Sequence, residues 1–211
     1  MTEFDIASAI RNYVTSHEGV TNFKPSLQQI RDEVDTLRIR LLTEQDVQNR
    51  YVFSFEQYYQ IIDIKPKYNS ATRKTTAAIP VLYFRSNGKP AHRYVGGSRG
   101  DTPHKLVTGN DKYWAMHSPY TGQMATVIYE EGILDFLSKT PTTIRVEAVF
   151  EKPSACRKYN GYDWMKDRYP VPQSMVDILI GKTAESYLRT MYRVPPQPNT
   201  QSDIPGANAA K

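Results

Sequence analysis

The first fifty residues contain two stretches in which apolar residues recur every three or four positions, the spacing of one face of an α-helix. In the first stretch these positions are Phe4, Ala7, Ile10 and Val14. Thr2 stands where an N-terminal capping residue is expected, and Gly19 ends the pattern. The spacing therefore predicts a short amphipathic helix between Thr2 and Gly19.

The second stretch predicts a longer helix. It opens with Ser26 and Gln29, which have the S-x-x-Q spacing of a capping box. One side is then apolar, with Leu27, Ile30, Val34, Leu37 and Leu41. The other side is charged, with Arg31, Asp32, Asp35 and Arg38. We expect the charged side to face solvent, and Leu37 and Leu41 to lie in the core or in a seam between chains.

From about Tyr51 the period changes to two, which is typical of strands. Asn87-Gly88 is a strong hairpin signal between residues 81–85 and 92–94, and Gly96-Gly97 is expected to break the second strand. Further short strands are predicted at residues 105–108, 113–116, 124–129, 133–137 and 143–150. Strands at this spacing favour an antiparallel sheet or a small sandwich.

The last third predicts one more helix and a tail. Pro170 and Pro172 precede a helix expected from about Gln173 to Arg193, because proline fits the first turn of a helix. Its apolar stripe contains Met175, Leu179, Thr183 and Tyr187. After Val194 the chain is rich in proline and small polar residues, a composition that predicts an extended segment.

Together these patterns predict an α+β fold in one compact domain. Residues 1–50 are the N-terminal helical segment, residues 51–170 the β-rich central region, residues 171–193 the C-terminal helix, and residues 194–211 the Pro-rich tail. A chain of 211 residues can bury a sizeable core, roughly 70% of its unfolded surface.

Charge is unevenly distributed along this chain, whose formal net charge is +5. Residues 1–50 have a net charge of −2, whereas residues 51–170 have a net charge of +6. Residues 64–110 contain nine Lys and Arg side chains and one acid, Asp101. Such a stretch needs either a solvent-facing surface or a polyanionic partner such as nucleic acid. Several of the fifteen tyrosines interleave with it, and they suit a sheet surface, a protein interface or stacking on bases.

No arrangement of catalytic or metal-ligating residues is recognisable. The histidines, at positions 17, 92, 104 and 117, lack metal-ligand spacing, and Cys156 is the only cysteine. We therefore expect no enzymatic activity, no cofactor and no metal site. Gly96–Pro103 superficially resembles a phosphate loop but lacks the terminal Gly-Lys-Ser/Thr. We expect it to be a loop between strands, with anion binding by its backbone N–H groups as the alternative.

A membrane partner is not expected. No run of about 18 apolar residues is present, so no transmembrane helix is predicted. Residues 1–5 lack the basic and apolar regions that open a signal peptide.

Three segments resemble virion structural proteins of tailed bacteriophages. They are a strand that ends in Val-Phe-Glu-Lys-Pro at residues 144–153, residues 169–176 with the helix that follows, and the helix at residues 26–42. Among such proteins, the chain is similar to neck or collar ring proteins of crAss-like and related phages, in which many copies form a ring below the portal. The likeness covers about half of the chain, and the basic stretch lies outside it.

The resemblance implies a structural virion protein that assembles in the host cytoplasm, as a subunit of a neck or head-to-tail connector ring through which DNA passes. Its implied partners are further copies in a cyclic homo-oligomer, the portal, and neighbouring tail or collar proteins. Non-specific contact with double-stranded DNA is expected of Lys89, Arg93, Arg99 and Lys105. Contact with other subunits is expected of Leu37, Leu41, Tyr192, Val194, Pro195 and Pro196. The alternative is a sequence-independent nucleic-acid-binding protein that uses the basic, Tyr-rich middle region.

Overall fold

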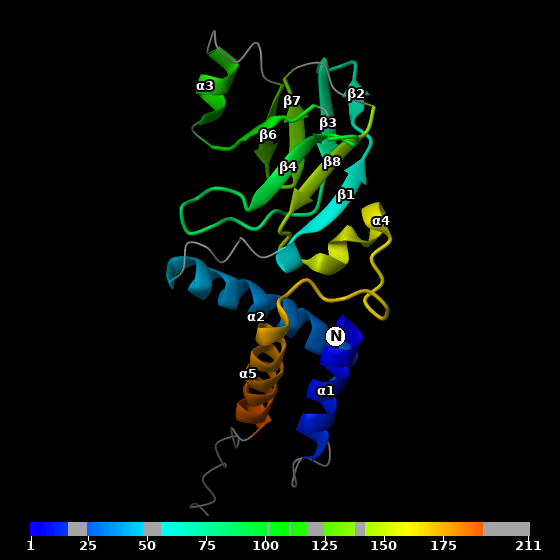
Figure 1. The fold of residues 1–211 in the computed structure, drawn as a ribbon, viewed down its shortest axis with the longest axis vertical. Helices are drawn as coiled ribbons and strands as arrows, with labels where there is room; N and C mark the ends of the chain where they lie inside the picture. The colour runs from blue at the N-terminus through cyan, green and yellow to red at the C-terminus, as the bar shows by residue number, and fades with distance from the viewer. Residues whose placement is uncertain are drawn as a thin grey trace, which may run out of the picture.

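The computed structural model describes residues 1–16, 25–48, 56–100, 102–109, 111–117, 125–137 and 142–191. The molecule is elongated, with three long helices at one end and the strands at the other (Figure 1). This is the α+β fold that the sequence predicted. The predicted contact residues of the tail, Tyr192, Val194, Pro195 and Pro196, lie outside the described residues.

Helix α1 (Glu3–Ser16) begins where the sequence predicted. The Thr2 hydroxyl oxygen accepts a hydrogen bond from the Asp5 N–H at 3.1 Å, and the Asp5 carboxylate accepts one from the Thr2 N–H at 2.9 Å. This reciprocal cap satisfies N–H groups that have no partner within the helix. The buried side of the helix contains Ile6, Ala7, Ile10 and Val14, whereas Phe4 is only half-buried.

Helix α2 (Leu27–Gln48) carries the predicted capping box. The Ser26 N–H donates to Gln29 Oε1 at 2.9 Å, and the Gln29 N–H donates to Ser26 Oγ at 3.2 Å. The expectation of a solvated charged side was wrong for Asp35 and Arg38, which are buried, with 5% and 0% of their surface exposed, whereas Asp32 is exposed as expected. Other elements therefore cover part of that side of the helix as well.

The strands form two sheets. One has the order β1-β8-β4, with β1 (Gln60–Ile64), β8 (Ile144–Ala148) and β4 (His92–Gly97), and both pairings are antiparallel. The other has the order β2-β3-β7-β6-β5, with β2 (Lys67–Asn69), β3 (Lys74–Ala78), β7 (Ile133–Phe136), β6 (Thr126–Glu130) and β5 (Lys105–Val107). The strands β5 and β6 are parallel, which the predicted antiparallel arrangement did not include. Apolar residues of both sheets share one core, as in a small sandwich.

The predicted turn at Asn87-Gly88 is confirmed, and a second tight turn joins β6 to β7. Across Asn87-Gly88, the Arg85 N–H donates to the Lys89 carbonyl at 2.9 Å, so the chain reverses there. Between β6 and β7, Glu131 and Gly132 have φ values of 45° and 82°. Left-handed conformations at both central residues are those of a type I′ hairpin turn.

One local prediction was correct and another was wrong. The strand β4 ends at Gly96-Gly97 as predicted, and a Cβ on Gly96 would lie 2.3 Å from the Thr102 carbonyl oxygen. The glycine is needed there because another backbone passes so close. Residues 113–116, predicted as a strand, belong to the short helix α3 (Asp111–His117).

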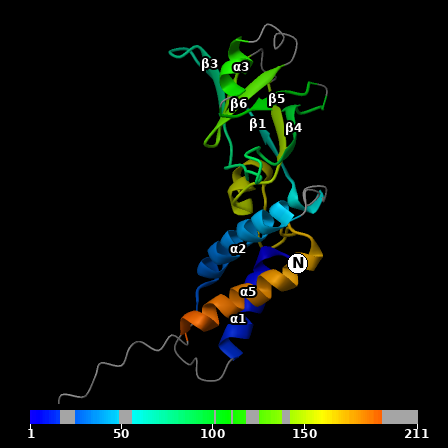
Figure 2. The same ribbon diagram turned by 90° about the vertical axis from the view of Figure 1, so that its left-hand side faces the viewer.

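The C-terminal helix α5 (Gln173–Met191) packs against α1 and α2 (Figure 2). Its buried side contains Met175, Val176, Leu179, Thr183 and Ala184. The helical core also includes Tyr83, Ala91 and Val149 from the β region. Residues from segments next to the strands therefore pack with the helices. A 3₁₀ turn at Pro153–Cys156 and the short helix α4 (Arg157–Asn160) follow β8 and contact β1.

Candidate functional site

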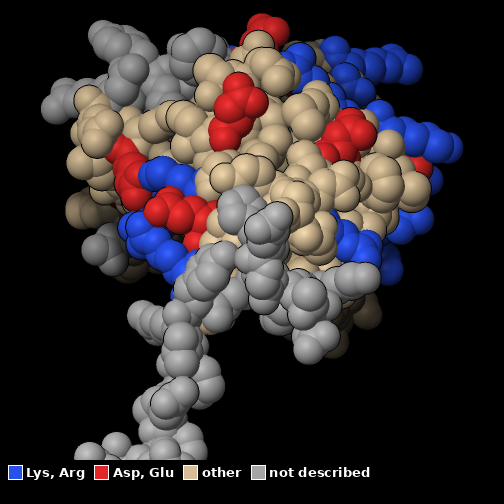
Figure 3. All heavy atoms as spheres, turned by 90° about the horizontal axis from the view of Figure 1, so that it is seen from below, with Lys and Arg blue, Asp and Glu red and all other residues tan. Residues whose placement is uncertain are grey.

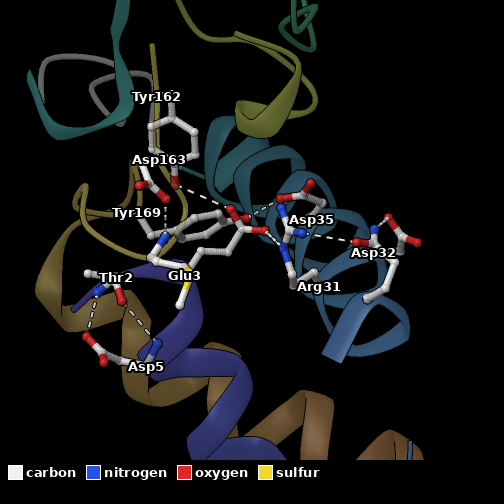
Figure 4. A network of polar contacts seen from close by, with 11 residues as sticks. Thr2, Glu3, Asp5, Arg31, Asp32, Asp35, Tyr162, Asp163 and Tyr169 are labelled. Carbon is white, nitrogen blue, oxygen red and sulfur yellow. Dashed lines mark hydrogen bonds and ion pairs between the residues drawn. The ribbon is translucent and has the colours of Figure 1, made fainter. Parts of the chain in front are cut away.

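A buried polar network joins α1, α2 and the segment before α5 (Figure 4). Arg31 Nε donates to Glu3 Oε1 at 2.5 Å, and the Tyr162 hydroxyl donates to Glu3 Oε2 at 3.4 Å. The Tyr169 hydroxyl donates to Asp35 Oδ1 at 2.6 Å. Burial raises the pKa of Glu3 and of Asp35, although these hydrogen bonds oppose the rise. The network ties the start of α1 and the segment before α5 to the middle of α2.

Arg38 connects α2 to two further segments. Its Nη1 donates to the Phe150 carbonyl at 2.9 Å, and its Nε donates to the Pro170 carbonyl at 3.3 Å. The side chain is fully buried, so these bonds satisfy carbonyls that water cannot reach. Arg38 therefore fixes the end of the β8 segment and the start of the α5 segment against one helix, which is an architectural role.

The turn at Asn87-Gly88 is anchored to the C-terminal end of α2 by Asp46. Its carboxylate accepts hydrogen bonds from the Ser86 N–H at 2.6 Å and from Arg85 Nε at 3.3 Å. Burial alone would raise the pKa of Asp46, but these bonds and the Arg85 charge outweigh it and leave the pKa below its usual value. The anchor orients the turn that carries Lys89.

The four residues predicted to face DNA are exposed but do not form one cluster. Lys89 lies in the turn before β4, Arg93 near the start of that strand, and Arg99 in the turn beyond its end. Lys105 is the first residue of β5. An isolated β-bridge pairs Gly96, near the end of β4, with Pro103, just before β5. The Arg93 guanidinium lies 3.5 Å from Glu147 and 4.1 Å from the centre of the Tyr59 ring, so part of its charge is compensated. The four side chains therefore lie on different segments of the β region.

A second basic surface, which sequence reasoning did not select, lies on the β2–β3 hairpin. Its exposed side chains are Lys65, Lys67, Arg73 and Lys74, and Tyr68 between them is 66% exposed. Lys74 is paired with Asp135 at 2.8 Å, and no ion pair joins the other three to a described residue. The signal in the sequence was a run of ten residues, 65–74, without an acid.

Three N–H groups of the Gly96–Pro103 loop, the candidate anion donors, have partners within the chain. The Gly97 N–H donates to the Thr102 carbonyl at 3.2 Å, the Gly100 N–H to the Gly97 carbonyl at 2.9 Å, and the Ser98 N–H to the Thr143 carbonyl at 3.3 Å. Because these donors are used within the chain, they are not available to a phosphate. The segment is a turn between β4 and β5, which agrees with the expectation of a loop between strands.

Only one of the two leucines proposed for subunit contacts reaches the surface. Leu41 is 6% exposed and belongs to the helical core. Leu37 is half-buried and lies in a groove of about 430 Å³ between α2 and α5, whose rim is charged. The rim residues are Glu33, Arg40, Lys182, Glu185 and Arg189.

A second groove, of about 420 Å³, lies between α1 and α5. It is lined by Tyr13, Ile178, Gly181, Lys182, Glu185 and Leu188. Seen from below, the middle of the helical end carries mainly uncharged side chains, and charged ones gather towards its edges (Figure 3). This end therefore offers another protein surface one recess that is lined mainly by uncharged side chains.

Among the described residues, no group of three or more His, Cys, Asp or Glu side chains could hold a metal ion. Cys156 is buried, and burial raises the pKa of its thiol to about 12, so the thiolate is scarce at neutral pH. No helix in the part of the chain that the structure describes has the length and apolar character needed to cross a membrane.

Comparison with known proteins agrees with a structural role. No curated protein matches the chain. A family model described as phage tail ring protein 2 matches residues 5–207, a span that runs from α1 through both sheets and α5 into the tail. The chain therefore belongs to the phage tail ring protein 2 family of crAss-like phages.

Proposed function

We propose that this ring protein is a subunit of the neck, or head-to-tail connector, of the virion, and that DNA passes through the ring. The observation that carries the proposal is a division of the molecule into two surfaces. The helical end has two grooves between helices, one with a charged rim and one lined mainly by uncharged side chains, and the β region displays the exposed side chains of Lys89, Arg93, Arg99 and Lys105. A channel subunit needs both, because it must bind its neighbours and tolerate a polyanion.

The β region supplies the proposed contact with double-stranded DNA. Lys89, Arg93, Arg99 and Lys105 are exposed on and around β4 and β5, and the β2–β3 hairpin adds Lys65, Lys67 and Arg73. Basic side chains that are spread over several segments fit a surface along which DNA slides, since a dense cluster would hold the backbone too firmly. The contact is with phosphates and is independent of sequence.

The partners in the assembly are further copies of the chain, the portal, and adjacent tail or collar proteins. Leu37 offers one apolar contact in the α2–α5 groove. Tyr192, Val194, Pro195 and Pro196 would add an extended segment that docks on a neighbouring subunit, because proline lowers the entropy lost on docking.

The test replaces Arg93, Arg99 and Lys105 by Gln in the phage. Rings should assemble normally, and the particles should package or retain less DNA because phosphate contacts are lost. A matched control replaces Arg157, Lys158 and Lys166, three exposed basic residues that are not among the proposed DNA contacts, by Gln and should keep the normal DNA content. Full DNA content in the first variant would rule out the proposed channel contact.

The exposed Tyr68 among Lys65, Lys67 and Arg73 also favours a second function, sequence-independent nucleic-acid binding by the free subunit. Retention of the purified monomer on duplex DNA, weakening steeply with salt, would support it. A defined cyclic oligomer with no such retention would favour the connector.

A further inference from the structure

A third groove, of about 280 Å³, lies between the start of β1, the end of α4 and the segment that leads into α5. Three tyrosines line it, Tyr59, Tyr162 and Tyr169, together with Pro170. Tyr59 is half-buried, whereas Tyr162 and Tyr169 are buried and form the floor. Among the described residues, no aromatic side chain lines the α2–α5 groove and one lines the α1–α5 groove, so the third groove differs from both in chemistry.

This tyrosine groove has a fixed floor and polar groups on its rim. The hydroxyls of Tyr162 and Tyr169 donate to buried carboxylates, so both rings are held in position (Figure 4). The exposed side chains of Gln57 and Arg168 bring N–H donors to the rim. Grooves lined by aromatic rings bind proline-rich segments in the polyproline II conformation, whose backbone carbonyls have no partners within the segment and can accept from such donors.

The chain itself contains a segment of this kind shortly after α5. Residues 195–198 are Pro-Pro-Gln-Pro. Proline presets φ near the polyproline II value, so the segment loses little conformational entropy when it docks. Residues 194–202 carry no charged side chain, and the tyrosine groove has one acid and one base, Asp167 and Arg168. An uncharged proline-rich segment therefore suits a groove without net charge.

The prolines cannot reach the tyrosine groove of their own chain. Helix α5 has 19 residues, so it is about 27 Å long. The groove lies beyond the start of this helix, because Tyr169 and Pro170 belong to the segment that leads into α5, and the helix runs away from that segment (Figure 1). Even fully extended, the chain places Pro195 within about 14 Å of Met191 and Pro198 within about 25 Å. Residues 195–198 can therefore occupy this groove only on another copy.

We propose that residues 195–198 of one copy dock in the polyproline II conformation in the tyrosine groove of the next copy. The proposal rests on the ring function proposed above and names the surface that receives the tail. The segment that docks and the groove that receives it are different patches of the same chain. Contacts between two different patches are those that close a ring when they are repeated around it.

The first test detects the contact by cross-linking in the full chain. Gln57→Cys on the rim of the groove, combined with Gln197→Cys in the tail, should give covalent multimers when assembled rings meet a mild oxidant, and each single variant should not. The control pair is Gln28→Cys with Gln197→Cys, since Gln28 is an exposed glutamine of α2 that lines none of the three grooves. It should not cross-link. The buried Cys156 does not interfere.

The second test changes only the tail. Replacing Pro195, Pro196 and Pro198 by Gly keeps its length but removes the preset φ angles, and should weaken ring assembly at least about tenfold. The Tm of the monomer should not change, because the groove of the same chain is out of reach. The control replaces three neighbouring residues without proline, 199–201, by Gly and should assemble as the wild type does. Native mass spectrometry over a dilution series measures the assembly.

Two results would overturn the proposal and leave the ring function intact. One is a proline-free tail that assembles as well as the wild type does. The other is a pair of Gln57→Cys and Gln197→Cys that gives no multimers from intact rings, or none beyond those of the control pair. If the wild-type chain forms no ring at all, the ring function itself fails, and this proposal with it.

Discussion

Arg38 shows how far a local pattern can mislead at the scale of one residue. Alternating basic and acidic residues on one side of a helix are typical of a solvated face, and the sequence predicted one here. The partners that bury Arg38 are the carbonyls of Phe150 and Pro170, more than a hundred positions away. Only the tertiary arrangement brings them together, so no local signal revealed this site.

We expect Arg38→Met to lower the free energy of unfolding by about 3–5 kcal/mol, because two buried carbonyls lose their donor and Asp35 loses a nearby positive charge. Arg40→Met is the control, since the Arg40 side chain is 75% exposed, and it should change stability by less than about 0.5 kcal/mol. Urea denaturation of both variants measures the difference. Equal effects would mean that Arg38 is solvated.

Asp46 makes a pH-dependent contribution. Its folded-state pKa is lowered, so the carboxylate stabilises the fold above the unfolded-state pKa of about 3.9, and this contribution is lost as the pH falls through the folded-state pKa. Asp46→Asn should cost about 1–3 kcal/mol at pH 7, and the gap to the wild type should narrow below about pH 4. Denaturation midpoints at several pH values measure this gap. The exposed Asp177→Asn should behave as the wild type does, whereas a gap for Asp46→Asn that stays constant with pH would contradict the anchor.

At the scale of elements, long periodic segments were predictable and short ones were not. Helices α1, α2 and α5 have at least three turns of regular apolar spacing and capping or proline signals at their starts. Helix α3 has only seven residues, and its Tyr-Trp pair favours a strand by propensity. Its helical form is supported by Asp111 in the first turn and by the ion pair of Lys112 with Glu130 at 2.9 Å.

The two sides of α2 should respond differently to truncation. Leu42 is fully buried, so Leu42→Ala should lower the free energy of unfolding by about 2–5 kcal/mol. Leu37 is half-buried in the α2–α5 groove, and Leu37→Ala should cost about 1 kcal/mol in the monomer. Thermal unfolding measures both variants. The reverse order would mean that α2 is rotated relative to the structure.

At the scale of the whole molecule, the pattern predicted the fold class and the sequence likeness predicted the family, but neither predicted the order of the strands. The central strand β8 pairs with both β1 and β4, and Ile62 and Val95 both lie opposite Val146. Such pairings join segments 50 to 90 positions apart, and no local pattern encodes them. The same holds for the grooves of the helical end, because each is formed by two helices that are distant in sequence.

The tail belongs to this scale because its proposed role is in the assembly. A chain truncated after Arg193 should fold with an unchanged Tm, because the residues removed, 194–211, are poor in large apolar side chains. It should nevertheless fail to assemble or to recruit its neighbour, since Val194, Pro195 and Pro196 are lost. Assembly by the truncated chain is measured by complementing a phage that lacks the full-length chain and counting infectious particles. Infectious particles at normal yield would show that the tail is dispensable.

The central claim is that this chain builds a closed ring in the phage neck by contacts between its helical ends. Electron microscopy of the purified full-length protein, alone and mixed with its portal, tests it most directly. The account predicts closed rings of uniform copy number, with the helices at the contacts between copies and the basic β region facing the channel. Particles that stay monomeric under both conditions, or rings whose basic residues face outward, would contradict it.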